Sequence, residues 1–477
     1  MKRKTIIMIA LLLILLLPLS LLAVDRLLPD YYAESYYAEL SPMLRHIQDS
    51  EGQRLIVLGN SDVAFGLDGA MLESLLEDKG LRYTVCPFGL YAAVGMSAML
   101  SLTENELRQG DLVVLVVEPV SEALSSYFGA TAFLKCAESD PGLLLRLNAS
   151  QRQAVLGSYI EYLQARFSYY REGTSPIPRD AYAKSSFDSR CDLRYPRNGN
   201  QMPLGFDSSA MVSLADVQIE EAFIEQIQAY CRKAEQSGAR VCLSFSPVNS
   251  ASLRDHSPEA VWAFFQRVHA AFPCPIISDP NQYLMDSGWF YDSNFHLNSA
   301  GAVVRTVMLA GDIAAFEGCC EPVRAELPSM PPMAAVSLDT GGDMDTFLFE
   351  PLKNGWIISG VTEAGSSMET LTVPSEHEGG PVVGFSPDAL SNASGLTRLI
   401  LPSTIIAIPD GLFSGCPQLS ALVFAPRTNL CRFAPETLRS MPSLTIYVPE
   451  KDYPMYREGF GCEQNEWERF LNRIETY

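Results

Sequence analysis

Two residues far apart in the chain have the types that nucleophilic catalysis needs. Ser61 follows the apolar run Leu55–Leu58 inside Gly59-Asn60-Ser61-Asp62, and His296 stands downstream with Asp292 four residues before it. A serine hydroxyl becomes a good nucleophile when an imidazole takes its proton, and a carboxylate fixes the tautomer of the imidazole and stabilises its charged form. The chemistry would therefore be covalent catalysis by Ser61, with His296 as base and Asp292 as its partner. Alternatively, the Ser61 hydroxyl could cap a helix beginning near Leu67.

Further polar residues beside these segments could line the same site. Asp62 also fits a turn-stabilising role, and Asn249, after a fourth apolar run, fits a structural turn equally well. Glu118, when ionised, accepts hydrogen bonds, so it could hold a backbone N–H or a cation such as Arg305. Asn294 or a backbone carbonyl could orient His296 in place of Asp292. The candidate lining residues are Asn60, Asp62, Glu118, Asn249 and Asn294.

No metal or cofactor site is expected. The other histidines lack a companion Cys, His or carboxylate at ligand spacing: His46, His256, His269 and His377. The eleven cysteines include no CxxC pair, so neither structural zinc nor a dense disulfide framework is indicated. The net charge of −21 argues against nucleic acid as a partner, because nucleic-acid affinity comes largely from cationic side chains.

Short apolar runs alternate with helical patterns from Arg54 to about Phe316. Such runs indicate a parallel sheet with helices on both faces, and therefore a three-layer, doubly wound α/β domain over residues 51–320. Residues 121–237 form a helical insert, which could build a lid or a recognition surface. In this fold Ser61 lies at the carboxyl edge of the sheet, where open α/β folds bind ligands. Residues 26–50 predict a juxtamembrane helix, either a stalk or a first packing helix.

The N-terminus predicts a membrane anchor. Lys2, Arg3 and Lys4 precede a run without charge from Ile6 to Val24, which as a helix nearly spans a bilayer. Residues 1–25 are therefore a cytoplasmic cationic end and a transmembrane signal-anchor, although a cleaved signal peptide remains open. In either case the rest of the chain faces outward, as a bacterial cell-surface protein.

Residues 345–477 repeat, after a proline-rich linker at 321–344. Met368-x-x-Leu371-x-Val373-Pro374 aligns with copies at Leu396, Leu419 and Leu444, and a second apolar element recurs between them. Periods of about 20–29 residues are typical of a leucine-rich solenoid. The unit ILPSTIIAIPDGLFSGCPQLSAL resembles the BspA-type leucine-rich repeats of bacterial surface proteins. That resemblance implies an extracellular binding or adhesion module with a protein or glycan ligand, while a short cap on the α/β domain remains the alternative.

The first part of the chain resembles the SGNH (GDSL-like) hydrolases, and more closely their DltD-like branch. The resemblance implies that Ser61 is the nucleophile, that Gly89 and Ser61 supply N–H groups to the oxyanion hole, and that Asp292 and His296 complete the triad. Two positions depart from the family pattern: Asp-x-x-x-His replaces Asp-x-x-His, and Glu118 stands where the third block usually supplies an Asn.

These observations together predict a membrane-anchored esterase or O-acyltransferase. It would act through an acyl-serine intermediate on O-acyl esters of cell-surface glycans or polymers, or on small esters. The rival hypothesis is a non-catalytic adhesion protein that binds through its repeats and carries a degenerate SGNH domain.

Overall fold

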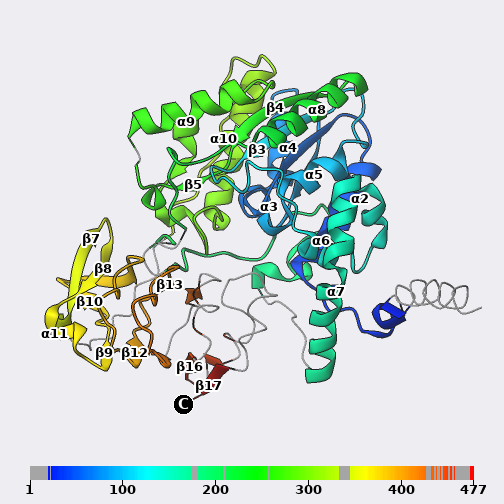
Figure 1. Cartoon of the computed structure of the whole chain (residues 1–477). Helices are drawn as coiled ribbons and strands as arrows, with labels where there is room; N and C mark the ends of the chain where they lie inside the picture. The colour runs from blue at the N-terminus through cyan, green and yellow to red at the C-terminus, as the bar shows by residue number, and fades with distance from the viewer. Residues whose placement is uncertain are drawn as a thin grey trace, which may run out of the picture.

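The structure is a computed structural model. It describes residues 20–21, 23–173, 180–202, 205–207, 210–255, 257–331, 344–425 and 431–433, together with 437, 441, 444–449, 452–453, 456 and 473–476. The chain is a mixed α/β protein with parallel sheets. Figure 1 shows an α/β part, built from the first two thirds of the chain, above a strand-rich part from the last third.

The central sheet of the α/β part has four parallel strands in the order β2-β1-β3-β4. They are β1 (Arg54–Gly59), β2 (Thr84–Gly89), β3 (Leu112–Val117) and β4 (Arg240–Phe245). Leu243 also pairs in parallel with Ile276, so a further extended segment lies beside β4. Every residue of β1 and β3 is buried, as expected for strands covered on both faces.

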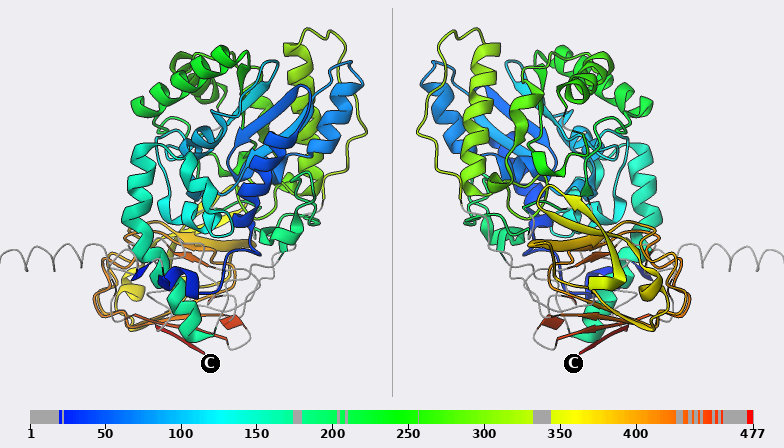
Figure 2. Two further views of the ribbon diagram at one scale, coloured as in Figure 1. Left: turned by 90° about the vertical axis from the view of Figure 1, so that its right-hand side faces the viewer. Right: turned by 90° about the vertical axis from the view of Figure 1, so that its left-hand side faces the viewer.

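Alternate residues of the strands enter two hydrophobic clusters, one on each face of the sheet. Leu55 and Val57 pack with α4 (Gly69–Glu77) and α10 (Ser299–Phe316). Ile56 and Leu58 enter the larger cluster, which several helices supply: α2 (Leu40–Asp49), α5 (Met96–Thr103), α6 (Ala130–Ala137), α7 (Ala149–Glu172), α8 (Glu221–Ser237) and α9 (Pro258–Ala271). Helices therefore cover both faces of the sheet, as Figure 2 shows from two sides.

The chain between β3 and β4 contains α6, α7 and α8. Helix α7 begins with a capping box between Asn148 and Gln151, and α8 ends at Gly238, whose φ of 78° is the left-handed conformation of a C-cap glycine. Before the sheet, Met43, Leu44 and Ile47 of α2 are buried in the core. The segment 26–50 therefore contains a packing helix and not an exposed stalk.

The aligned repeats form neighbouring strands of one parallel five-stranded sheet, in the order β17-β16-β14-β12-β9. Leu371, Leu399, Leu422 and Ile446 stand at equivalent positions of the repeat and pair in register. All four are fully buried, so the repeated leucine position forms the interior of this part. The strands are β9 (Thr370–Thr372), β12 (Arg398–Leu401), β14 (Ala421–Phe424), β16 (Thr445–Val448) and β17 (Ile474–Thr476).

Shorter elements complete this part. The second apolar element of the repeats includes β13 (Ala407–Ile408) and β15 (Arg432–Phe433), which pair in parallel. A four-stranded sheet has the order β10-β11-β8-β7. In the chain, β7 and β8 precede β9, β10 and β11 follow it, and the short helix α11 (Glu363–Ser366) lies between β8 and β9. The strands of this sheet are β7 (Phe347–Leu352), β8 (Gly355–Val361), β10 (Glu376–His377) and β11 (Gly380–Phe385).

The predicted anchor at Ile6–Val24 and the linker residues 332–343 lie largely or wholly outside the described residues. Among the residues that are described, α10 is the one helix long and apolar enough to cross a membrane. Leu309, Ala310 and Ile313 of α10 are buried beneath the central sheet, which accounts for its apolar character.

Candidate active site

Ser61 is the first residue of α3 (Ser61–Gly66), which follows β1 after a tight turn. A Cβ on Gly89, at the end of the neighbouring strand, would lie 2.4 Å from the Asn60 carbonyl oxygen, so only glycine allows this approach of the two backbones. The capping alternative for Ser61 does not hold, because Asp68 caps the next helix, α4, by accepting from the Met71 N–H at 3.0 Å.

Ser61, His296 and Asp292 form one hydrogen-bonded chain at the carboxyl edge of the sheet. The Ser61 Oγ lies 2.8 Å from His296 Nε2, across 235 positions of sequence, and His296 Nδ1 lies 2.8 Å from Asp292 Oδ1. Ser61 is 7% exposed, and the side chains of His296 and Asp292 are 11% and 22% exposed. The residues are therefore in hydrogen-bonding geometry and still open to a small reactant.

A local turn accommodates the longer Asp-x-x-x-His spacing. The Ser293 hydroxyl accepts from the N–H groups of Phe295 and His296 at 3.2 and 3.1 Å, and the Tyr291 N–H donates to the His296 carbonyl at 2.8 Å. This closed turn brings the Asp292 carboxylate back to the imidazole. The groups within hydrogen-bond distance of His296 Nδ1 are the Asp292 carboxylate at 2.8 Å and the Tyr182 hydroxyl at 3.3 Å, and not the expected alternatives Asn294 or a backbone carbonyl.

The charges around Asp292 favour its ionised form. Burial alone would raise the pKa of Asp292, but His296, the Tyr182 hydroxyl and the Arg432 guanidinium together lower it. Because an ionised carboxylate only accepts hydrogen bonds, the neutral imidazole of His296 carries its proton on Nδ1, and its Nε2 can accept from Ser61. This is the tautomer that a general base requires.

Two aromatic residues complete the surroundings of the triad, and the sequence reasoning missed both. The Tyr182 hydroxyl donates to Asp292 Oδ2 at 2.6 Å, and burial and the charge of Asp292 raise the pKa of Tyr182 well above its usual value. Phe65 stacks on the His296 ring with centroids 4.0 Å apart and planes at 11°. Tyr182 lies in the insert, where no motif marks it. Phe65 stands four residues after Ser61 on the same helix, α3, and this spacing is the signal that could have found it.

A third missed residue reaches Asp292 from the C-terminal part. Arg432 in β15 donates to the Asp292 carbonyl at 3.2 Å and forms an ion pair with Asp207. A small apolar contact accompanies it, in which Phe206 and Ala251 of the α/β part meet Val383 and Ile406 of the C-terminal part. The two parts therefore touch at the backbone carbonyl of Asp292.

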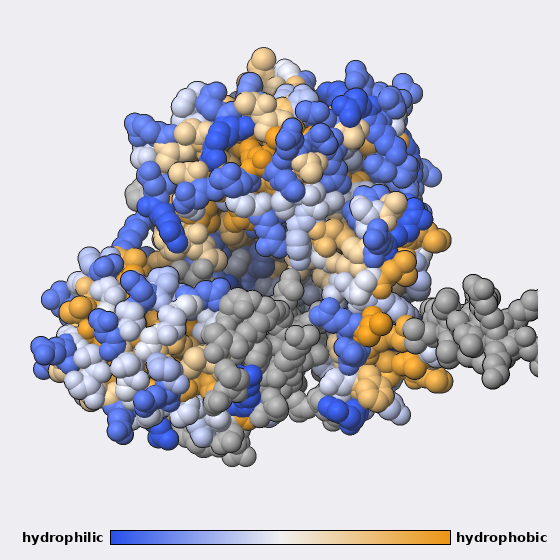
Figure 3. Space-filling view, viewed as in Figure 1, coloured by the Kyte–Doolittle hydropathy of each residue, from blue (hydrophilic) through white to orange (hydrophobic). Residues whose placement is uncertain are grey.

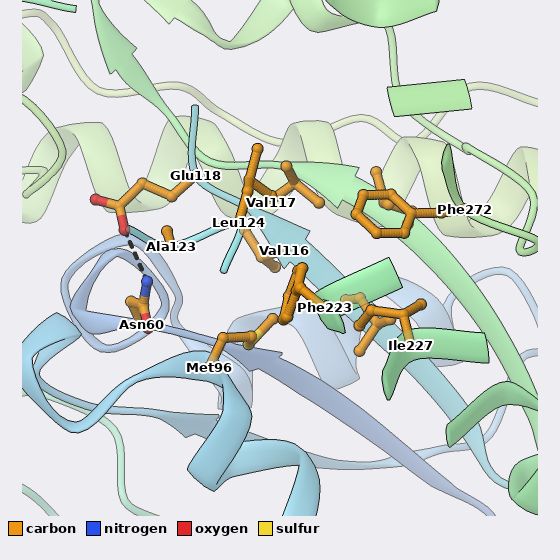
Figure 4. Close-up of a pocket in the computed structure, with 12 residues that line it drawn as sticks. Asn60, Met96, Val116, Val117, Glu118, Ala123, Leu124, Phe223, Ile227 and Phe272 are labelled. Atoms are coloured by element: carbon orange, nitrogen blue, oxygen red, sulfur yellow. Dashed lines mark hydrogen bonds between the residues drawn. The ribbon is translucent and has the colours of Figure 1, made fainter. Parts of the chain in front are cut away.

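On the other side of Ser61, Asn60 and Glu118 form a buried pair. The Asn60 side-chain amide donates to Glu118 Oε2 at 2.8 Å, as Figure 4 shows. Burial and the charge of Asp62 raise the pKa of Glu118 to about 8. Glu118 thus holds Asn60, and not the expected backbone N–H or Arg305, and it is largely protonated at neutral pH.

Asp62 and Arg305 lie behind this pair. The Asn60 N–H donates to Asp62 Oδ1 at 3.1 Å, which is the turn-stabilising contact expected of this residue. Burial raises the pKa of Asp62, against the opposing effects of Arg305 and the Ser246 hydroxyl. Arg305 donates to the Phe245 carbonyl at 3.3 Å.

Asn249 and Asn294 use their side chains to hold loops. The Asn249 amide donates to the Gly205 carbonyl at 2.6 Å, and its oxygen accepts from Ser287 at 2.9 Å. The Asn294 amide donates to the Asp207 and Ala210 carbonyls at 2.9 and 2.8 Å. Both support the turns next to the site, which favours the structural alternative for Asn249. His256, among the histidines considered above, lies outside the described residues.

An apolar cavity adjoins Asn60 and Glu118 and is lined by Met96, Phe223 and Phe272 among others (Figure 4). Its free volume of about 10 Å³ corresponds to roughly one water-sized sphere. In this conformation the cavity therefore holds no room for an acyl chain.

No protein-family model matches the chain, and no curated protein matches it.

Proposed function

We propose that the protein is a serine esterase or O-acyltransferase that acts on O-acyl esters through an acyl-serine intermediate. The single observation that carries this proposal is the chain of two 2.8 Å contacts from Ser61 through His296 to Asp292. The strand order and the place of Ser61 after β1 support assignment to an SGNH-like, doubly wound α/β domain.

The reaction follows from the donors and acceptors in place. The Ser61 oxygen attacks the ester carbonyl carbon while His296 Nε2 takes the hydroxyl proton, and Asp292 stabilises the imidazolium. The oxyanion accepts hydrogen bonds from the backbone N–H of Ser61, which opens α3, and from that of Gly89. The carbon–oxygen bond to the leaving alcohol then breaks, and His296 returns the proton to that alcohol. Water or a sugar hydroxyl, deprotonated by His296, releases the acyl group from Ser61.

The remaining parts of the chain suggest where the enzyme works. The in-register strands of the C-terminal part support a short solenoid of leucine-rich repeats, which would bind a protein or glycan. The uncharged run Ile6–Val24 would anchor the chain in the cell membrane with both parts outside. An anchored esterase samples the acylated glycans and polymers of its own envelope, which are the proposed substrates.

Serine reactivity tests this proposal directly. The full chain should hydrolyse a short-chain nitrophenyl ester and bind a fluorophosphonate probe, and Ser61→Ala should abolish both. Ser158→Ala, on α7, is the matched control and should keep both activities. Labelling that is absent, or that persists in Ser61→Ala, would instead favour the adhesion hypothesis, in which the repeats alone carry the function.

A further inference from the structure

Helix α7 exposes large apolar side chains along its length. Leu156, Ile160, Phe167 and Tyr170 are 76%, 51%, 52% and 58% exposed. At about 100° of rotation per residue, these four lie in one stripe roughly 80° wide. The other side of α7 packs into the core through residues such as Tyr162. Within the stripe Leu163 is buried, whereas the described protein leaves these four side chains exposed.

The last residues of the apolar N-terminal run lie against this stripe. Leu21 and Val24 line a surface groove together with Ile160, Leu163 and Phe167. Figures 1 and 2 show the blue N-terminal stretch beside α7, and Figure 3 shows hydrophobic residues gathered on that side of the molecule. Next to them Leu27 is 82% exposed, so the apolar surface is continuous from the N-terminal segment to α7.

Arg166 fixes the N-terminal segment to α7. Its side chain is 3% exposed and forms ion pairs with Asp25 and with Glu138, the latter at 3.1 Å. It also donates to the carbonyls of Leu28 and Pro29 at 3.2 and 2.9 Å. The chain therefore emerges from its apolar run directly onto α7, with no free tether between the two.

We infer that the exposed stripe of α7 lies on the lipid bilayer that holds the N-terminal run. This inference rests on the membrane anchorage included in the proposed function. If Val24 ends a membrane-spanning helix, the fixed contacts of Asp25 place the neighbouring stripe at the level of the lipid headgroups. Arg152 and Arg171 are exposed near the two ends of the stripe, where they can meet anionic headgroups. The α/β part is then held against the membrane, and its substrate must be reachable there.

Quenching of an introduced tryptophan by lipid tests this orientation. The full chain is reconstituted in phosphatidylcholine and phosphatidylglycerol vesicles, with or without bromine on the acyl chains. Phe167→Trp should lose most of its added emission in the brominated vesicles. Leu348→Trp is the matched control, because Leu348 on β7 is also 52% exposed but lies in the C-terminal part, and its added emission should be unchanged. The four native tryptophans contribute equally to both variants.

Equal quenching of the two variants would overturn the inference. So would a blue-shifted Phe167→Trp emission that brominated lipid does not quench, because a second copy or another protein would then cover the stripe. A chain removed from the vesicles by alkaline carbonate would refute the anchor and the stripe assignment together. Ester hydrolysis by the same samples in detergent reports on Ser61 alone, so loss of the proposed reaction is distinguishable from loss of the membrane contact.

Discussion

Glu118 offers a quantitative test of the buried pair beside Ser61. It is 7% exposed, and burial together with the charge of Asp62 raises its pKa from 4.5 to about 8. The folded protein therefore holds this proton more tightly than the unfolded chain does. The resulting stability is fully present below pH 4.5 and is lost as the pH rises to about 8. At about 1.36 kcal/mol for each pH unit, the full window of about 3.5 units corresponds to roughly 5 kcal/mol, of which about 4 kcal/mol is lost between pH 4.5 and pH 8.5.

Glu118→Gln removes the titrating proton and keeps an oxygen that can accept from the Asn60 amide. The free energy of unfolding of the variant, minus that of the parent, should therefore rise by about 4 kcal/mol between pH 4.5 and pH 8.5. Urea unfolding at a series of pH values measures this difference. Glu161→Gln removes the same charge from an exposed position on α7 and serves as the control. A difference that does not change with pH would refute the buried, protonated state of Glu118.

The same substitution has a catalytic consequence. Ionised Glu118 would place a negative charge against Asn60, next to the atoms that must stabilise the oxyanion on Ser61. We expect the kcat of the parent to fall above about pH 8 and that of Glu118→Gln to persist to higher pH. Identical alkaline limbs in the two pH profiles would show that Glu118 does not act on the reaction.

Further substitutions test the remaining contacts. Asp292→Asn should lower kcat on the order of 10³- to 10⁴-fold, because the amide no longer fixes the Nδ1–H tautomer, and steady-state ester hydrolysis measures the loss. Tyr182→Phe should lower kcat/KM roughly 10- to 100-fold through loss of one charge-assisted hydrogen bond. Arg432→Gln should raise the pKa of Asp292 and move the acidic limb of the kcat/KM profile to higher pH, and Arg432→Lys should move it less. Leu399→Ala should lower the free energy of unfolding, measured with urea, by about 2–5 kcal/mol. Ile400→Ala is the control and should lower it less, because Leu399 is fully buried and Ile400 only partly. Equal losses in the two variants would contradict the interior position of the repeated leucine.

The elements that carry local sequence patterns could be predicted well. The runs at Leu55–Leu58 and Leu112–Val117 are continuous and apolar because both faces of their strands are buried. Ser61 could be singled out because a strand that ends in Gly59-Asn60 leaves the next side chain at the sheet edge. The rows of leucine in the repeats were equally visible, since each copy buries the same position.

Residues that reach the site through tertiary contacts could not be predicted. Tyr182 and Arg432 meet Asp292 across 110 and 140 positions of sequence, and neither belongs to a motif. Asn294 shows the opposite case. It lies next to His296 in sequence, which suggests a role in orienting the imidazole, but its side-chain amide donates to the Asp207 carbonyl. The hydrogen-bond partner of Glu118 could not be predicted either, because it depends on burial. Burial raises the pKa of Glu118, and the protonated side chain pairs with the Asn60 amide rather than with a cation.

The hydrogen bond from Arg432 to Asp292 affects when the proposed active site is completed during synthesis of the chain. A nascent chain folds from its N-terminus as it leaves the ribosome, at about 5–20 residues per second. Ser61 and His296 emerge long before Arg432, so the α/β part can assemble while the residue that completes the surroundings of Asp292 is still being translated. A transcript cut short within the repeats would thus yield a chain with Ser61 and His296 in place but without the hydrogen bond from Arg432 to the Asp292 carbonyl.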